Sequence, residues 1–592
     1  MRIRITVVVA SLLAAPSALA APPNPADVAV AVDRSLWGDA IDSSVPLSDD
    51  ATYLRRIMFD IVGRPATPGE ITAFGLNPSE NRRVDVISEL LKSEDYGSNW
   101  THYWRDAIFR RATNVRAGIV RPAFGEWMAE QLNSGRGWDQ IATDLLTYTG
   151  PVNDNGAAAL LFAHEGVPEE VAAEASRLFM GIQIQCANCH DHPWDSWKRE
   201  QFHQFTAFFP RVSVRRDRNS DNVFDYEISS MNADRSRNPG ASQFVLTRID
   251  RNRDSVITEQ EAKGTMLARI FNGPIKDNMD KNGDGKLSIQ EITTAQPPED
   301  RPGQGATEHY MPDLTDPGSQ GKKIDPAFFL GAKRTDSGLS DEERRNEAAD
   351  FITSKNNPWF ARAMINRVWY EMTGTAFYTP IDDIGPDREC VHEETLKILS
   401  DGFVRSNYDL KWLIETIAST RTYQRAPNTT AEGFAHCEPI RLRSDQLYAS
   451  LCQTLGVTGL PLRSEGRRAP YEMSRMDPGR EEFARIFGFD PSTPRDELTG
   501  SIPEALFLMN SDLLSRIIKM PGDNNVITRI STNVLGEEDV VRELYLTTVG
   551  REPSDGELSI ATDHIGSSAG LREGLEDLFW ALLNSPEFGS RR

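Results

Sequence analysis

The sequence predicts a mainly α, multi-domain helical protein that carries a C-x-x-C-H segment and an inserted pair of EF-hand loops. Three observations support this fold class. Helix-start motifs recur along the chain, as in Thr67-Pro68-Gly69-Glu70, where threonine caps the helix, proline fits its first turn and glutamate completes a capping box. Alternating apolar and polar residues, which indicate strands, are scarce. The length of 592 residues predicts about three to four domains.

Residues 1–20 have the features of a signal peptide. Arg2 and Arg4 precede an apolar stretch, and Ala18-Leu19-Ala20 is typical of a signal peptidase site. No cysteine follows that site, and no later run reaches the roughly 18 apolar residues of a membrane span. We therefore expect a protein without a membrane span that is periplasmic or secreted after signal peptide cleavage.

The composition is acidic and poor in cysteine. The formal net charge is −22, which disfavours nucleic acid and anionic lipid as partners. Five cysteines are too few for a disulfide-stapled scaffold. We predict no nucleic-acid partner, and the sequence leaves the oligomeric state open.

Residues 21–212 form the predicted N-terminal helical domain, and part of it recurs at the end of the chain. Residues 62–70 resemble residues 549–557, and residues 90–97 resemble residues 582–589. Two copies are too few for a solenoid. The repeat instead predicts helical hairpins in which glycine ends one helix and a capping box begins the next.

The pentapeptide Cys186-Ala187-Asn188-Cys189-His190 has the spacing of a c-type haem attachment site. Two thiols at this spacing bond covalently to haem vinyl groups while the histidine ligates iron. A helix predicted to start at Pro168 places the segment at or just beyond its C-terminal end. Covalent haem attachment in bacteria takes place outside the cytoplasm, so the predicted signal peptide agrees with this interpretation.

Two other interpretations of the C-x-x-C-H segment stay open. Thiolates and imidazoles also bind zinc, so a structural Cys/His metal site is the first alternative. A redox dithiol or a plain disulfide is the second. For an attached haem, His192 is too close in sequence to reach the opposite face, which leaves His203 or Met231 as the sixth iron ligand.

Residues 240–295 form the predicted EF-hand pair. The second loop, residues 280–291, has every constrained residue type of a calcium-binding loop, with Gly285 at the sharp turn. The first loop, residues 250–261, has Ser255 at the equivalent position. Because a side chain forced to positive φ costs about 1 kcal/mol or more, we expect this loop to bind Ca²⁺ more weakly.

The calcium ligands follow from the loop positions. Side-chain oxygens at positions one, three, five and twelve and the main-chain carbonyl at position seven surround the ion. Ile257 and Leu287 share one loop position and predict a short two-stranded contact that makes the two loops one folding unit. At the calcium level outside cells, we expect a structural role rather than a switch. The predicted ligands are Asp280, Asn282, Asp284, Lys286 and Glu291 in one loop, and Asp250, Asn252, Asp254, Val256 and Glu261 in the other.

Residues 296–323 are dense in helix breakers and predict a flexible linker. Residues 324–592 follow as a C-terminal helical domain. Within it, Ser340-Asp341-Glu342-Glu343 predicts a capping box, and Asn357-Pro358 opens a helix that Gly374 ends.

The C-terminal domain also holds a group of polar residues whose role the sequence does not decide. They either line a catalytic site or form a buried polar network between helices. Whether the protein is an enzyme is therefore left open. The residues are Arg362, Asn366, Asp382, Asp383 and His392.

Three cysteines lie outside the pentapeptide. Cys390 and Cys437 flank a helical segment, and an oxidising compartment lets them pair if their Cα atoms approach within about 7 Å. We predict this disulfide. Cys452 lies in an apolar helical stretch and predicts an inert core thiol.

At these motifs the chain resembles the planctomycete-type cytochrome c exported proteins, whose two characteristic domains are of otherwise unknown function. The resemblance covers most of the mature chain and implies a cytochrome mainly through the C-x-x-C-H itself, and the calcium pair looks like an addition to that pattern. The N-terminal likeness includes Tyr53-Leu54-Arg55-Arg56, Gly63-Arg64-Pro65 and Gln183-Ile184-Gln185-Cys186; the C-terminal likeness includes Asn357-Pro358-Trp359-Phe360, Asp382-Asp383-Ile384 and Ala505-Leu506-Phe507-Leu508-Met509-Asn510.

The leading functional prediction is an exported calcium-binding c-type haem protein that acts with a redox partner in electron transfer or a haem-dependent redox step. Cys186 and Cys189 attach the haem, and His190 is the proximal ligand. The alternative is a non-redox, calcium-stabilised extracytoplasmic scaffold that binds a partner or an extracellular polymer. In that case the Cys/His site is purely structural, with zinc as its metal.

Overall fold

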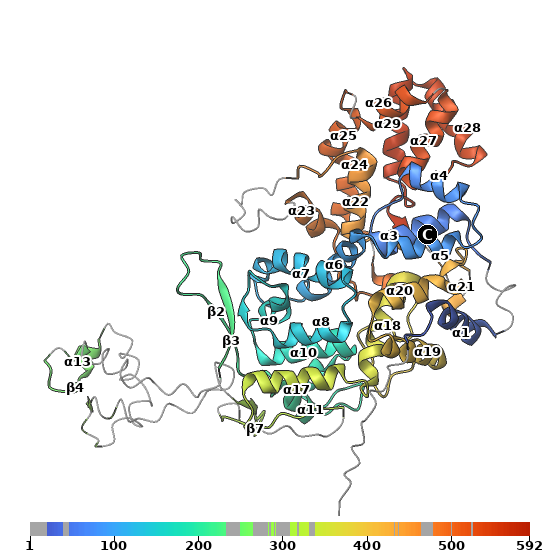
Figure 1. Ribbon diagram of the computed structural model, residues 1–592. Coiled ribbons are helices and arrows are strands. Elements are labelled where there is room, and N and C mark those ends of the chain that lie inside the picture. The colour runs from blue at the N-terminus through green and yellow to red at the C-terminus, as the bar shows by residue number, and fades with distance from the viewer. Residues whose placement is uncertain are drawn as a thin grey trace, which may run out of the picture.

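The described chain is mainly helical, as the sequence predicts (Figure 1). The predicted signal peptide, Asp280 and much of the EF-hand insertion lie outside the described residues. The computed structural model describes residues 21–38, 46–231, 249–250, 252–263, 282, 284, 286–288, 291, 308–316, 319–330, 338–430, 433–435, 437, 439–462, 478–498, 500–522, 525–534 and 536–591.

One hydrophobic core joins the two predicted helical domains, because its buried residues come both from 28–228 and from 328–434. The boundary predicted near residue 324 therefore does not separate two cores. The helices around this core are α1 (Pro25–Trp37), α3 (Asp50–Val62), α4 (Pro68–Leu76), α5 (Arg82–Leu90), α6 (Glu94–Phe109), α7 (Arg121–Asn133), α8 (Trp138–Thr147), α9 (Ala159–Ala163), α10 (Pro168–Met180), α11 (Arg199–Thr206), α17 (Asp341–Thr353), α18 (Pro358–Thr373), α19 (Glu393–Arg405), α20 (Leu410–Ser419) and α21 (Arg421–Gln424).

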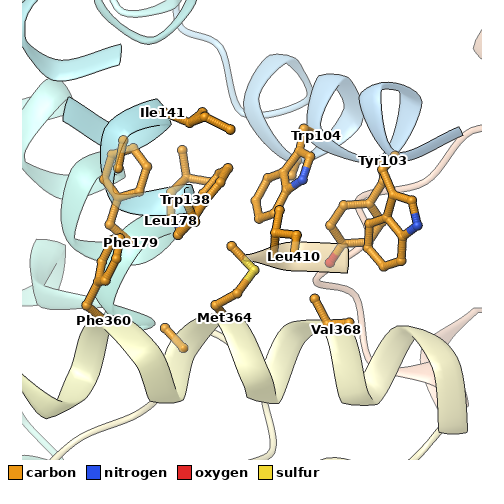
Figure 2. Close-up of a cluster of buried hydrophobic side chains, with 14 of the residues drawn as sticks. Tyr103, Trp104, Trp138, Ile141, Leu178, Phe179, Phe360, Met364, Val368 and Leu410 are labelled. Carbon is orange, nitrogen blue, oxygen red and sulfur yellow. The ribbon is translucent and has the colours of Figure 1, made fainter. Parts of the chain in front are cut away.

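Aromatic side chains dominate the centre of this first core (Figure 2). Trp104 of α6 stacks on Trp138 of α8 with ring centroids 4.3 Å apart, and Met364 and Val368 of α18 line the opposite side. An aromatic pair of this kind stabilises the fold by about 0.5–1.5 kcal/mol beyond its buried area.

The helix ends predicted in the C-terminal domain are confirmed. Ser340 and Glu343 form a capping box, and α18 ends at Gly374, which is in the left-handed region.

A second core contains the last helices of the chain together with Phe59 of α3. Phe59 therefore packs into the second core although its helix belongs to the first. The helices of this core are α22 (Ser444–Leu455), α23 (Pro478–Phe487), α24 (Ile502–Asn510), α25 (Asp512–Lys519), α26 (Val526–Asn533), α27 (Glu537–Val549), α28 (Asp555–Ser567) and α29 (Leu571–Leu583).

The repeat at the two ends of the chain is structural. Helices α3 and α27 each end at a glycine in the left-handed region, Gly63 with φ 74° and Gly550 with φ 77°. The next helices, α4 and α28, begin with capping boxes in which Thr67 and Ser554 cap backbone N–H groups. The predicted helical hairpins are confirmed at both ends.

Equivalent ion pairs hold each copy of the repeat. Arg64 lies 2.9 Å from Glu70 and 3.6 Å from Asp95. In the other copy, Arg551 pairs with Glu557 and Glu587 at 2.8 Å each. Both arginines tie the end of one helix to the start of the next. Arg64 also reaches Asp95 in the first turn of α6, and Arg551 reaches Glu587 in the turn after α29.

The two copies also contact each other, since α4 packs on α27. The link is strengthened by Arg55 of α3, whose guanidinium donates to the carbonyls of Val549 (3.2 Å), Glu587 (2.9 Å), Phe588 (3.1 Å) and Ser590 (2.9 Å). A single buried side chain therefore holds the end of the chain against its first repeat.

Strands are short. Strands β1 (Gly150–Pro151), β3 (Tyr226–Ser230) and β2 (Val212–Arg216) form an antiparallel sheet in that order. Strand β8 (Ile440–Arg441) pairs with β9 (Ser590–Arg591) and joins the start of the second core to the end of the chain.

The described part of residues 296–323 differs from the predicted flexible linker. Strand β6 (His309–Met311) pairs antiparallel with β7 (Lys322–Ile324), and β6 packs on α11. The hairpin is held by Glu308, whose carboxylate accepts hydrogen bonds from Arg211 at 2.7 Å and Arg344 at 3.1 Å. Composition could not show these pairings, because the Arg211 bond joins segments about a hundred residues apart.

The two predicted calcium loops meet as expected. Strand β4 (Val256–Ile257) pairs with β5 (Leu287–Ser288), with Ile257 opposite Leu287 and both side chains buried. Helix α13 (Glu259–Ala262) follows β4, and Figure 1 shows both lying apart from the helical body. The predicted contact between the loops is confirmed.

Among the described helices, none is both long enough and apolar enough to cross a membrane.

Candidate functional site

The C-x-x-C-H segment lies on a 3₁₀ turn just beyond α10. Helix α10 ends at Gly181 in the left-handed region (φ 68°), and the turn η4 (Ile184–Asn188) follows. Ile184 and Ala187 are buried, whereas Cys186 and Cys189 are exposed free thiols. The two apolar side chains anchor the turn on the first core and direct the thiols outward.

His190 is exposed and held through one ring nitrogen. Its Nδ1 lies 2.6 Å from the backbone carbonyl of Asp191, and a carbonyl only accepts, so Nδ1 carries a proton and Nε2 is the ring nitrogen that this bond leaves open. A hydrogen bond of this kind fixes the orientation of a metal-ligating histidine and leaves the other nitrogen for the metal.

The loop after His190 is closed by hydrogen bonds around Asp191. Its carboxylate accepts from the Lys198 ammonium at 3.0 Å and from the Arg199 backbone N–H at 3.0 Å. These two bonds lower the pKa of Asp191, the Arg199 bond most. The His192 backbone N–H donates to the Trp197 carbonyl at 2.8 Å, so the loop is held at both ends.

The carbonyl of Asn188, inside the C-x-x-C-H segment, is held by a pair of buried histidines. His203 of α11 donates from Nε2 to this carbonyl at 3.0 Å, so its Nδ1 accepts from His309 Nε2 at 2.8 Å. The two rings stack with centroids 5.1 Å apart, and His309 Nδ1 lies 3.8 Å from Glu169. Burial lowers the pKa of His203 to about 4 and that of His309 to about 3, so both are neutral at neutral pH.

The pair includes His203, one of the two residues predicted as a sixth iron ligand. Both nitrogens of His203 are engaged by other groups, so neither is available to iron in this structure. Met231 follows β3, and its sulfur lies 3.2 Å from Arg215 Nη2. His309 could not be recognised from the sequence, because it lies within the predicted linker, where no recognisable motif surrounds it.

The cysteines and histidines of the segment do not converge on one point. Across the described residues, which include Cys186, Cys189, His190, His192 and His203, no three His, Cys, Asp or Glu side chains gather as a metal-binding group. Haem attachment does not need such a gathering, because the thiols bond to the edge of the porphyrin and only the histidine reaches the iron.

The two predicted calcium loops share several internal hydrogen bonds among their described residues. Asn252 and Asn282 each accept from the backbone N–H two residues ahead at 2.9 Å. Asp254 and Asp284 do the same at 2.9 and 2.8 Å. The loops therefore share one backbone path over these positions.

The hydrogen bonds at the ends of the two predicted calcium loops also match. The Glu261 carboxylate accepts from the Thr258 N–H at 3.1 Å, and Glu291 accepts from the Ser288 N–H at 2.9 Å. Ser255 has a φ of 66°, which confirms the backbone strain predicted for the first loop. Asp250 accepts from the Ser255 N–H at 2.9 Å, whereas Asp280 lies outside the described residues.

The polar residues of the C-terminal domain are held by several different structural partners. Asp382 is buried between Arg177 and Arg367. Asn366 hydrogen-bonds to backbone groups of Phe377 and Tyr378. The structure supports the buried-network interpretation for these residues, since each has a structural partner.

The other polar residues of that set lie nearer the surface. Arg362 pairs with Glu393, and Asp383 pairs with Arg388 at 2.9 Å. His392 has a positive φ of 58° and packs edge-on against Phe434 with ring centroids 4.7 Å apart.

The predicted Cys390–Cys437 disulfide is wrong, because both thiols are free. Cys390 lies beside Glu393 and Tyr378, and burial with the Glu393 contact raises its pKa to about 12. Cys437 instead lies 3.9 Å from Arg56. Cys452 is buried in the second core, as predicted.

Comparison with known proteins identifies two domains. Residues 35–214 match the family model PSCyt2, described as a protein of unknown function (DUF1549), and residues 344–455 match PSD1, described as a protein of unknown function (DUF1553). No curated protein and no solved structure matches the chain. The first match contains the C-x-x-C-H segment, and the second runs from α17 into α22. The chain therefore carries the PSCyt2 and PSD1 domain pair that is associated with planctomycete cytochrome c proteins.

Proposed function

We propose that the protein is an exported c-type haem protein that acts in electron transfer or in a haem-dependent redox step. Cys186 and Cys189 would form the thioether bonds, and His190 would ligate the iron. The observation that carries the proposal is the arrangement of the segment: two exposed free thiols on an anchored turn, followed by an exposed histidine with Nδ1 engaged and Nε2 open.

The surroundings of the segment support this assignment. Exposed thiols are accessible to haem vinyl groups, and a histidine oriented through Nδ1 offers Nε2 to a metal without reorganisation. The His203–His309 pair holds the Asn188 carbonyl and keeps the turn in place. When bound, haem would supply one-electron chemistry at its iron, and its position on an exposed turn suits exchange with a redox partner.

The proposal is tested on protein produced with a haem-attachment system and measured as a pyridine haemochrome. We expect one covalent haem per chain. Cys186→Ala and Cys189→Ala should each abolish the two-thioether spectrum, because each removes one bond to the porphyrin. Cys390→Ala is the matched control, since this thiol is free but lies outside the segment. Protein with stoichiometric zinc, or with a Cys186–Cys189 disulfide and no haem, would establish the structural Cys/His alternative.

We further propose that the two loops around β4 and β5 bind Ca²⁺ and that the ion orders this insertion. The supporting observation is that both loops share the same hydrogen bonds and meet through Ile257 and Leu287. Two loops that share a buried contact order together, so one bound ion stabilises both. The second loop should bind more tightly, because the first has the strained Ser255.

Calorimetry on the full chain tests the calcium proposal. Wild-type protein should bind Ca²⁺ with a Kd of about 10⁻⁴ to 10⁻³ M, the range of extracellular modules. Glu291→Gln removes a bidentate carboxylate and should weaken binding by about tenfold or more. Glu259→Gln is the control, because this glutamate occupies a loop position that supplies no ligand.

Limited proteolysis provides the second measurement for the calcium proposal. In calcium, wild-type protein should resist cleavage within residues 243–292, and Glu291→Gln should be cleaved there while the flanking helical parts stay intact. The absence of Ca²⁺ binding at millimolar concentration, or equal protection of Glu291→Gln, would refute an ordering role.

A further inference from the structure

The loop that follows the C-x-x-C-H segment is contacted by residues of the second family domain. Asp195 of this loop lies within the PSCyt2 match, whereas Gly385 and Arg388 lie within the PSD1 match. A Cβ placed on Gly385 would lie only 1.7 Å from Asp195 Oδ2 and 2.8 Å from its Cγ. The two domains therefore touch here without room for a methyl group.

Asp195 differs from its neighbours in the loop. Pro193, Trp194 and Ser196 are exposed, whereas the side chain of Asp195 is only 2% exposed. Its carboxylate lies 3.9 Å from Arg388 Nε and accepts the Ser196 N–H at 2.6 Å. Because a buried carboxylate needs partners that offset its lost hydration, Asp195 fixes this part of the loop to the second domain.

Arg388 is itself held within the second domain. Its Nη2 lies 2.9 Å from Asp383, and its backbone N–H donates to the Gly385 carbonyl at 3.2 Å. The guanidinium group thus lies between two carboxylates, one from each domain. The charge that faces Asp195 is therefore in place before the loop packs against it.

The same segment also contacts the chain before the C-x-x-C-H segment. The Ile384 N–H donates to the Gly181 carbonyl at 2.8 Å, and a Cβ on Gly181 would lie 2.6 Å from Ile384 Cδ1. Gly181 precedes the C-x-x-C-H segment and Asp195 follows it. Residues 384–388 therefore hold the chain on both sides of the segment.

We propose that the second family domain positions the C-x-x-C-H loop, with Gly385 and Arg388 as positioning residues for His190. The inference rests on the proposed haem function, in which His190 ligates the iron. The hydrogen bonds of Asp191 within the loop are exposed to water and hold it weakly. The buried contact at Asp195 restrains the loop more firmly and so sets the direction of the histidine.

Gly385→Ala tests the contact directly. The glycine is not in the left-handed region, so the added methyl group acts through the space that it takes from Asp195. In protein without haem, hydrogen–deuterium exchange across residues 190–199 should become about tenfold faster or more, while exchange in α10 stays at the wild-type rate. Gly125→Ala in α7 is the matched control, since a Cβ there meets nothing within 4 Å.

A double variant shows whether the effect passes through Asp195. Asp195→Ala removes the atoms that the methyl group would meet, and the next atom, Arg388 Cγ, is at an ordinary contact distance of 3.4 Å. Gly385→Ala should therefore add nothing further to loop exchange in the Asp195→Ala background. Arg388→Gln, which removes the charge that faces Asp195, gives a second reading if Gly385→Ala does not fold.

Protein with covalent haem provides a readout that stability alone does not move. Gly385→Ala should shift the midpoint potential and the visible absorbance bands, because the placement of the axial histidine affects both. Unchanged loop exchange in both Gly385→Ala and Arg388→Gln, or faster exchange with an unchanged potential and spectrum, would overturn the inference. A wild-type chain that attaches no haem would refute the proposed function instead, and exchange in the haem-free protein would still decide whether the second domain restrains the loop.

Discussion

Asp382 has a carboxylate of the kind that can act in catalysis, but in this structure it forms two buried ion pairs. Its carboxylate lies 2.8 Å from Arg177 of α10 and also pairs with Arg367 of α18, and all three side chains are buried. Burial raises the pKa of Asp382, but the two guanidinium groups outweigh it and bring the value to about 2. The charged form is therefore held in place between two helices.

Replacement of Asp382 by asparagine should be strongly destabilising. It leaves two buried guanidinium groups without their shared carboxylate, and breaking a buried ion pair costs about 3–5 kcal/mol. Asp383→Asn is the matched control: this neighbour forms a partly exposed pair with Arg388, worth about 0–1 kcal/mol. Denaturant unfolding at neutral pH measures both, and equal costs would contradict the assigned role.

The same carboxylate predicts a pH dependence. The folded pKa of Asp382, about 2, is below its ordinary value of 3.8, so its stabilisation is complete above pH 3.8 and is lost as the pH falls toward 2. The difference in unfolding free energy between wild-type protein and Asp382→Asn should therefore shrink across this window. A constant difference from pH 5 to pH 2 would disprove the assignment.

At the scale of elements, the two copies of the repeat differ at the glycine that ends their first helix. A Cβ on Gly63 would lie 2.6 Å from Asn99 Oδ1, whereas a Cβ on Gly550 would meet nothing closer than 3.8 Å. Asn99 has little freedom to move, because its amide donates to the carbonyls of Asp60 at 3.0 Å and Ile61 at 3.1 Å.

Alanine at these two glycines should therefore have unequal effects. Gly550→Ala forces a left-handed residue and costs about 1–2 kcal/mol. Gly63→Ala carries the same cost plus an overpacking cost of about 1–3 kcal/mol against Asn99. Unfolding free energies of the two variants give the comparison. Equal values would mean that Asn99 relaxes freely.

Local sequence patterns predicted helix ends correctly where the residues that contact one another lie close together along the chain. The capping boxes at Thr67 and Ser340, and the helix end at Gly374, depend on contacts within a few residues. The pairing of Ile257 with Leu287 could be predicted because these residues occupy the same position in the two predicted calcium loops, where paired loops form a short two-stranded contact. The β6–β7 hairpin was missed because partners from distant segments hold it, and composition does not show distant partners.

At the scale of the whole molecule, the cores do not follow the predicted domain boundaries. Residues before and after the insertion share one core, and Phe59 of α3 lies in the other. The turn with Cys186 and Cys189 was located from sequence because its motif is continuous. The contact of Gly385 with Asp195 was not, since its two sides come from segments that meet only after folding.

The hydrogen bonds of Arg55 can form only after most of the described chain has been synthesised. Its acceptors, the carbonyls of Val549, Glu587, Phe588 and Ser590, are synthesised about five hundred residues after Arg55. At roughly 5–20 residues per second, ribosomes take on the order of half a minute to two minutes to reach them after Arg55 has been made. During that time the guanidinium of α3 has none of these acceptors. The first repeat therefore gains these contacts only after Ser590 has been made, and a chain that stops before Val549 lacks all four of them.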